Sequence, residues 1–133
     1  MDEIDAKIVK MLKENSRMSF VDVAKKLGVS EGTIRLRVKK LLANKELHFT
    51  IEDEKELRAI ILVTTSTGAP TTKVANAIKA LGIRTVYEVS GQFDIVCLIE
   101  AYDISAINDL IENIRGVNDV ADTNSLIVLK NDK

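Results

Sequence analysis

The sequence predicts an α+β protein in which an N-terminal helix-turn-helix unit, winged-helix-like, precedes a C-terminal ferredoxin-like unit with the order βαββαβ. Two observations predict this division of the 133-residue chain. The apolar spacing is helical near the N-terminus and later alternates between strand-like runs and amphipathic stretches. The charge also changes sign, because residues 1–45 hold 11 Lys/Arg and 6 Asp/Glu (net +5), whereas residues 46–133 hold 8 and 14 (net −6). We therefore expect domains at 1–47 and 58–133, joined by a linker at 48–57.

Three helices account for the N-terminal segment. Asp2, Ser19 and Ser30 are each a favoured N-cap before an apolar, helically spaced stretch. Gly28 suits the left-handed position that ends the second helix, and only Val29 separates it from the next cap. Two helices joined by a short glycine-containing turn, with a third packed across them, are typical of a helix-turn-helix unit. The side chains expected to face its core are Ile4, Ile8, Met11, Leu12, Phe20, Val23, Ala24, Leu27, Ile34, Val38, Leu41 and Leu42.

The third helix of such a unit enters the major groove of double-stranded DNA. The positive charge of the segment supports this partner, although a basic helix face is often only solvated. Thr33, Arg37 and Lys40 recur at helical spacing and are predicted to share an outward stripe. Leu36 is apolar near this face, and it either packs on a neighbouring element or contacts a thymine methyl group. The candidate DNA-binding residues are Ser30, Glu31, Thr33, Arg35, Arg37, Lys39 and Lys40.

The C-terminal segment alternates strands and helices between glycine-containing breaks. One helix is expected after a cap at Thr71 or Thr72, and another after a cap at Asp103 or Ser105. A tight turn is expected at 91–93. The predicted strands are 48–51 within the linker, 60–65, 83–90, 94–101 and 120–129, and the first helix is expected to face the core with Val74, Ala77, Ile78 and Leu81.

Both faces of the predicted sheet are apolar. Residues 60–63 and 95–99 are apolar at consecutive positions, whereas the strands of a sheet that is covered on one side normally alternate. In the βαββαβ arrangement both helices cover the same face, so the other face would be exposed. We expect a second copy of the sheet to cover it, which makes the protein a homodimer. Two symmetric helix-turn-helix units would match a palindromic DNA site with half-sites ~34 Å apart.

This architecture resembles the leucine-responsive/asparagine-type (Lrp/AsnC) family of transcriptional regulators over essentially the whole chain. The resemblance implies a dimer that associates further, commonly into octamers, and that binds operator DNA. Its markers are Asp5 and Ile8, Ala24 with Leu27-Gly28-Val29-Ser30, Arg37-Val38-Lys39-Lys40-Leu41, Val89 with the G-x-x-D turn Gly91-Gln92-Phe93-Asp94, and Thr123-Asn124-Ser125.

The resemblance also implies that a free amino acid binds around the G-x-x-D turn. The Asp94 carboxylate would pair with the α-ammonium group, while N–H groups beside Gly91 and hydroxyl groups would bind the α-carboxylate. The alternative is that Gly91 only permits the turn and Asp94 only caps it. Nearby acids, Asp122 and Glu88, would suit a cationic side chain such as that of lysine. The candidate effector-binding residues are Gly91, Asp94, Asp122, Thr123 and Ser125.

Other classes of function are less well supported. Some proteins that resemble this family decarboxylate tetrapyrroles, but such chemistry needs convergent acid–base groups, and the only histidine, His48, lies in the linker. The single cysteine, Cys97, forms no internal disulfide and with one histidine cannot close a zinc site. We expect no enzyme activity, metal or cofactor, and a cytoplasmic protein, since no apolar run approaches the ~20 residues that span a bilayer. A nucleoid-type architectural protein, which coats DNA without an effector, shares every helix-turn-helix residue and stays an alternative.

Overall fold

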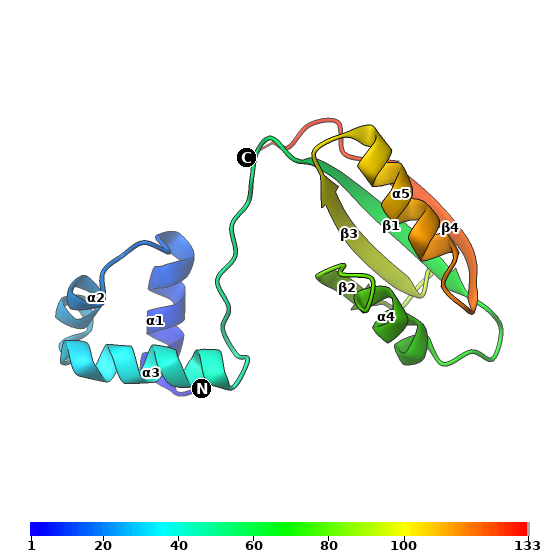
Figure 1. Ribbon diagram of the computed structural model, residues 1–133. Coiled ribbons are helices and arrows are strands. Elements are labelled where there is room, and N and C mark those ends of the chain that lie inside the picture. The colour runs from blue at the N-terminus through cyan, green and yellow to red at the C-terminus, as the bar shows by residue number, and fades with distance from the viewer. Residues whose placement is uncertain (133) are drawn as a thin grey trace. The chain divides into compact units, whose positions relative to one another are not determined.

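The structure, a computed structural model, describes residues 1–132 of the chain. An N-terminal unit, Met1–Glu52, and a C-terminal unit that begins at Asp53 each have their own hydrophobic core (Figure 1). The N-terminal unit contains α1 (Glu3–Glu14), α2 (Phe20–Leu27) and α3 (Glu31–Ala43). The C-terminal unit contains β1 (Leu57–Thr65), α4 (Thr71–Lys79), β2 (Thr85–Glu88), β3 (Ile95–Ala101), α5 (Ile104–Arg115) and β4 (Val120–Ile127). The predicted fold class is confirmed.

Polar caps and a left-handed glycine set the helix boundaries of the N-terminal unit. The Asp2 carboxylate accepts a hydrogen bond from the Asp5 N–H (2.9 Å), and the Asp5 carboxylate accepts one from the Asp2 N–H (3.3 Å), so a reciprocal capping box begins α1. The Ser19 hydroxyl accepts a hydrogen bond from the Asp22 N–H (3.1 Å) and begins α2. Gly28 then ends α2 with φ at 69°, a conformation that a side chain would strain. These boundaries lie where the sequence predicts them.

The three N-terminal helices enclose one apolar core, with two corrections to the sequence prediction. Leu42 was expected in this core but is 41% exposed, because helical geometry turns it about 100° away from the buried Leu41. The predicted strand at 48–51 is wrong: these described residues form neither helix nor strand, and Phe49 and Ile51 are exposed. A strand needs a neighbour for its backbone hydrogen bonds, and residues 1–52 contain no other strand. The buried residues that form this core cluster are Ile8, Leu12, Val23, Ala24, Ile34 and Val38.

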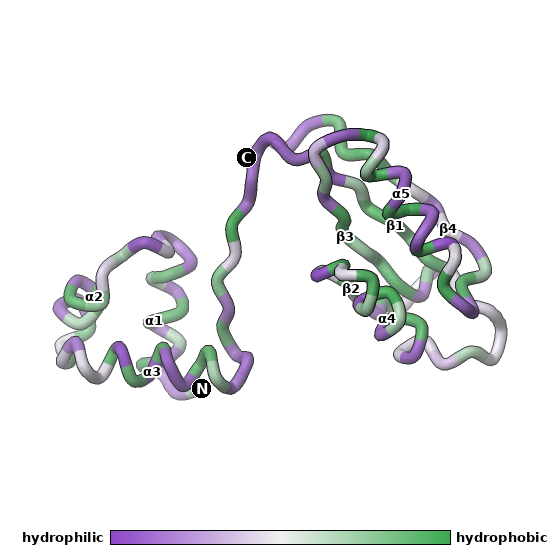
Figure 2. Tube along the Cα trace, in the orientation of Figure 1, coloured by the Kyte–Doolittle hydropathy of each residue, from purple (hydrophilic) through white to green (hydrophobic). Residues whose placement is uncertain are grey.

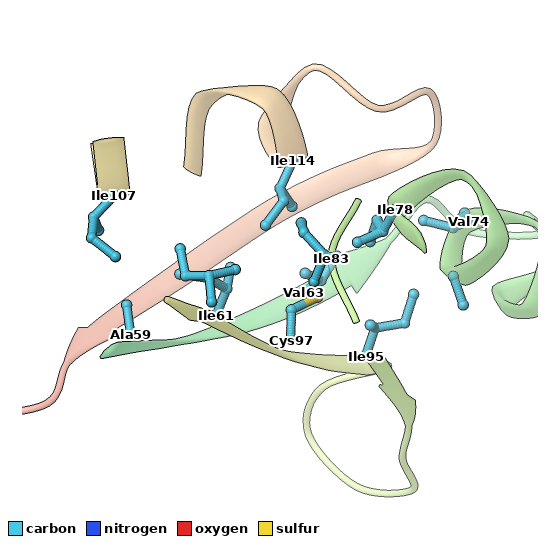
Figure 3. Close-up of a cluster of buried hydrophobic side chains, with 12 residues drawn as sticks. Ala59, Ile61, Val63, Val74, Ile78, Ile83, Ile95, Cys97, Ile107 and Ile114 are labelled. Atoms are coloured by element: carbon cyan, nitrogen blue, oxygen red, sulfur yellow. The ribbon is translucent and has the colours of Figure 1, made fainter. Parts of the chain in front are cut away.

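The C-terminal unit is a four-stranded antiparallel sheet in the order β2-β3-β1-β4. Successive residues of each strand point to opposite faces of the sheet. The buried side chains of β1 and β3 meet those of α4 and α5 on one side of the sheet, as Figure 3 shows for Ile61 and Cys97 below Ile78 and Ile114. Both helices therefore cover the same face. This is the ferredoxin-like arrangement that the sequence predicts.

The start and inner face of α4 differ from the prediction. Pro70 occupies the N-cap position and makes no side-chain hydrogen bond there, and Thr71 is already helical, so the predicted threonine cap is wrong. Ala77 and Leu81 are exposed rather than inward-facing. Their places in the core are taken by Ala75 and Ile83. With only nine residues, α4 is too short for apolar spacing to distinguish adjacent core positions.

The face of the sheet opposite α4 and α5 is apolar and open. Register pairs place Leu62 with Val96, and Ile60 with both Leu98 and Leu126, on this face. Leu98 and Leu126 are exposed. Figure 2 shows hydrophobic colouring through the middle of β1 and β3, and no helix among residues 53–132 covers this face. Separately, no described helix is long and apolar enough to cross a membrane.

Candidate functional site

The first turn of α3 is fixed by its own cap. The Ser30 hydroxyl accepts a hydrogen bond from the Thr33 N–H (3.2 Å), and the two side-chain oxygens lie 2.9 Å apart in a second hydrogen bond. Both hydroxyl groups are therefore engaged in the cap. Either oxygen still has capacity for a further partner, because a hydroxyl group is both a donor and an acceptor.

Arg35 is exposed but held from two sides. Its guanidinium group forms an ion pair with the Glu31 carboxylate, one helical turn earlier. Its guanidinium carbon also lies 5.7 Å from the ring centre of Phe20 in α2, which is within the range of a cation–π interaction. The Arg35 side chain is nevertheless 65% exposed. Its outer N–H groups are thus accessible to a ligand while its position is constrained.

Arg37 does not lie on the free outward stripe that helical spacing predicts with Thr33 and Lys40. Its guanidinium group pairs with the carboxylates of Asp2 and Asp5, at 3.1 Å from Asp5, and its side chain is only 29% exposed. The hydrogen bond from Arg37 is the main cause that lowers the pKa of the Asp2 carboxyl group below its usual value. Arg37 therefore joins α3 to the start of α1. The pairing depends on how the helices pack, which spacing along one helix does not reveal.

Leu36, Lys39 and Lys40 are exposed residues of α3 that follow Arg35. Neither lysine forms an ion pair with any residue from 1 to 132. Leu36 is 67% exposed. Leu36 and Lys40 also border a hollow of 480 Å³ between α3 and the start of α1, which Asp2 and Asp5 line from the other side. This face of α3 is thus cationic with one apolar side chain at its centre.

Two groups that support α3 are not apparent from the sequence pattern. Phe20 was assigned only to the apolar face of α2, yet its ring also lies against Arg35. Asp2 and Asp5 were assigned to the helix cap and to the family resemblance, yet they also bind Arg37. The sequence gives only a weak indication that the acidic residues at the start of α1 pair with Arg37 on α3, because tertiary packing sets this pairing.

The G-x-x-D turn of the C-terminal unit is tied to the adjacent strand. The Asp94 carboxylate accepts hydrogen bonds from the backbone N–H (2.9 Å) and the hydroxyl group (3.2 Å) of Thr65, and the Asp94 N–H donates to the carbonyl oxygen of Val63 (3.0 Å). Gly91 is exposed with φ at 126°. A Cβ atom at this position would have space, but a residue with a side chain would be strained in this backbone conformation. Gly91 and Asp94 therefore have a structural role in the turn, which is the role that they have in the alternative without a bound amino acid.

The candidate residues of β4 point to different faces of the sheet. Thr123 is paired with Val63 and Ser125 with Ile61, so both lie on the face that carries the helices, at positions where Thr123 is half-buried and Ser125 exposed. Asp122 is paired with Thr64 and belongs to the opposite, open face. Thr123 and Asp94 both meet β1 at Val63, whereas Asp122 is paired with the next residue, Thr64, on the other face.

The two acids that suggested a cationic effector also lie apart. Glu88 is paired with Ile95 on the helix-bearing face, and its carboxylate accepts a hydrogen bond from the Thr72 hydroxyl (2.8 Å). Asp122 lies on the other face. The two carboxylates therefore lie on opposite faces of the sheet.

Cys97 is not placed for covalent catalysis. Cys97 is buried in the core between the sheet and the helices, and burial raises the pKa of its thiol to about 11. A thiol in that state is a poor nucleophile at neutral pH. Within residues 1–132 no three His, Cys, Asp or Glu side chains are grouped to hold a metal ion.

Comparison with known families and proteins assigns both units. Residues 1–42 match the AsnC-type helix-turn-helix domain, and residues 58–133 match the Lrp/AsnC ligand binding domain. The chain is 40% identical over 134 residues to the HTH-type transcriptional regulator LysM of Sulfurisphaera tokodaii, covering 98% of this chain and 96% of that protein. It is also 40% identical to the regulator of the same name from Saccharolobus solfataricus, covering 98% and 94%.

Solved structures share the fold at lower sequence identity. The leucine response regulatory protein of Mycobacterium tuberculosis superposes with a TM-score of 0.81 at 22% identity, covering 98% of this chain and 94% of that one. A transcriptional regulator of Neisseria meningitidis, solved as an L-Met complex, superposes with a TM-score of 0.75 at 20% identity, covering 100% and 92%. With these matches, the two units and their order are accounted for: the chain belongs to the Lrp/AsnC family of transcriptional regulators and is not an enzyme.

Proposed function

We propose that this regulator binds a palindromic operator in the cytoplasm, with α3 of each of two protomers in the major groove. The observation that carries the proposal is the exposed cationic face of α3, directly after the turn at Gly28. Such a face suits the phosphate backbone and the acceptor groups of base edges. Arg37, which pairs with α1, supports the helix instead of contacting DNA. The proposed contacts are Ser30, Glu31, Thr33, Arg35, Lys39 and Lys40.

Dimerisation through the open face of the sheet supplies the second DNA-binding unit. This face carries exposed Leu98 and Leu126 beside half-buried Ile60 and Leu62. Exposed apolar patches of this kind mark protein–protein interfaces, and a symmetric interface places the same patch on both partners. Further association into octamers, which the family resemblance implies, would bring other surfaces of the C-terminal unit together.

We further propose that a free amino acid binds the C-terminal unit and changes operator affinity. Support comes from the match to a ligand binding domain and from the related regulator that was solved with L-Met. The proposed contacts are at the G-x-x-D turn and β4: Gly91, Asp94, Thr123 and Ser125, with Asp122 contributed from another protomer. A basic amino acid such as lysine would suit Asp122. Isothermal titration with all twenty amino acids tests this preference, which binding of only apolar or acidic amino acids would contradict.

Selection of bound fragments from genomic DNA, with and without an amino-acid mixture, tests the whole proposal. We expect a few fragments that share a two-fold symmetric motif, and a change in their recovery when amino acids are present. Recovery of fragments without a shared motif would indicate an architectural DNA-coating protein. Recovery that is identical with and without amino acids would remove the effector from the proposal.

A further inference from the structure

Arg35 is the arginine of α3 that is best placed to contact a base, and two neighbours restrict its movement. The Glu31 carboxylate binds the guanidinium group from one helical turn away, and the ring of Phe20 lies 5.7 Å from its carbon. Phe20 is itself half-buried and packed against the core of the N-terminal unit. The guanidinium group is therefore held between a charge on α3 and a ring on α2, although it is 65% exposed.

We propose that Glu31 and Phe20 are positioning residues that orient Arg35 toward a guanine in the operator. This inference rests on the proposed operator binding and specifies how sequence is distinguished. A guanidinium group with two free, parallel N–H groups pairs with O6 and N7 of guanine, which is the commonest specific contact between proteins and the major groove. A long side chain that is already held loses less freedom on binding. Fixed orientation therefore strengthens the guanine contact more than it strengthens contacts to phosphates.

The charge of Glu31 adds a second effect. A carboxylate at the start of α3 repels phosphate groups wherever the helix binds, regardless of sequence. The same carboxylate favours the contact that Arg35 makes with guanine. Glu31 should therefore weaken binding to random DNA while preserving binding to the operator, which raises the ratio between the two affinities.

The test compares affinities for the selected operator, for random duplex DNA and for operator with 7-deazaguanine, which lacks the N7 acceptor. Arg35→Ala should reduce discrimination by about 5- to 150-fold, which corresponds to 1–3 kcal/mol for a bidentate contact. Glu31→Gln should raise affinity for random DNA. It should also reduce the operator-to-random ratio at least about threefold, which is a fraction of the discrimination that Arg35 supplies. Phe20→Leu should reduce the ratio without raising affinity for random DNA. Both changes in the ratio should vanish in the Arg35→Ala background and on 7-deazaguanine DNA, whereas the rise in affinity for random DNA on Glu31→Gln should persist.

Glu3→Gln is the matched control, because Glu3 forms an ion pair with Lys7 at the same i,i+4 spacing on α1. It should leave the ratio unchanged. Thermal unfolding of each variant separates this role from a merely structural one, since lost stability alone lowers both affinities together. An unchanged ratio in Glu31→Gln and Phe20→Leu would overturn the inference, as would a change in the ratio that persists without Arg35. Absence of DNA binding by the unaltered protein would instead overturn the proposed function.

Discussion

The N-terminal and C-terminal units differ in how much of a candidate site one protomer contains. In the N-terminal unit, α3 presents the candidate DNA contacts, and residues of α1 and α2 in the same unit support it. In the C-terminal unit, Asp94 is bound to Thr65, Asp122 faces away from Thr123, and one apolar face of the sheet is open. We therefore propose that DNA contact is a property of each protomer, whereas ligand binding and operator symmetry depend on assembly.

The largest effect is expected from a charge on the open face of the sheet. Leu98→Asp would bury a carboxylate without a partner in the proposed interface, so we expect monomers in sedimentation experiments. Operator affinity should fall at least about a hundredfold, because two linked contacts become one. Asn108→Asp, on an exposed position of α5, is the control and should change neither property. A Leu98→Asp protein that stays dimeric and binds the operator normally would contradict the proposed interface.

The next effect concerns the effector response. Asp94→Asn keeps an oxygen that can accept the hydrogen bonds of Thr65 but removes the charge that would bind an ammonium group. We expect loss of the ligand-dependent change in operator affinity, which is typically about 5- to 150-fold, with affinity in the absence of ligand unchanged. Thr65→Val, which removes one hydrogen bond to Asp94 but leaves its charge, should retain the response. A normal response in Asp94→Asn measured by titration would remove Asp94 from the site.

A smaller and sequence-independent effect is expected at Lys40. This exposed lysine has no ion-pair partner among the described residues, so its charge is available to phosphate groups. Lys40→Ala should weaken binding to operator and random DNA alike. It should also reduce the slope of log affinity against log salt by about 0.9 per lost phosphate contact. Fluorescence titrations over a salt series measure both; a loss confined to the operator would make Lys40 a base contact.

Leu36 should affect binding only where the operator carries thymine. Its exposed side chain at the centre of α3 is placed to contact a thymine methyl group. Replacement of single thymines by deoxyuridine should lower affinity about fourfold at one position, since a buried methyl group contributes ~0.8 kcal/mol. Leu36→Ala should lower affinity and abolish that sensitivity, whereas Leu42→Ala should do neither. Equal sensitivity to deoxyuridine in Leu36→Ala would show that another residue detects the methyl group.

The smallest effect on DNA specificity is expected from replacement of Arg37, which should instead lower the stability of the N-terminal unit. Arg37→Ala should lower the thermal midpoint of unfolding at neutral pH, and Arg37→Lys should restore part of it. The lowered pKa of Asp2 means that the pair stabilises the fold above the ordinary pKa of an aspartate. This stabilisation is lost as the pH falls through the lowered pKa, so the two midpoints should converge in acid. Calorimetry across pH tests this; a constant difference would contradict the ion pair.

Local signals predicted most of the fold correctly. The caps at Asp2, Ser19 and Ser30 and the left-handed Gly28 are properties of a few adjacent residues, and the structure contains each of them. Asp103 likewise caps α5 through the Ala106 N–H (2.7 Å). Where an element depends on distant partners, the prediction was wrong: residues 48–51 lack a strand to pair with, and α4 is too short to fix its inner face.

The candidate sites follow the same rule. Helical spacing predicted which residues of α3 lie in its first turns, but it placed Arg37 on a free stripe because the carboxylates that bind it come from α1. Proximity along β4 grouped Asp122 with Thr123, although consecutive strand residues face opposite sides of a sheet. Sequence therefore identifies the segment that carries a site more readily than the partners of each side chain.

Hydroxyl-radical footprinting of a selected operator tests the central claim most directly. The account predicts two protected half-sites related by two-fold symmetry and centred about one helical turn, ~34 Å, or a multiple of it apart. Both half-sites should lose protection together in Leu98→Asp, because the dimer joins the two DNA-binding units. Unbroken protection of any duplex, or a single protected half-site in the unaltered protein, would contradict the account.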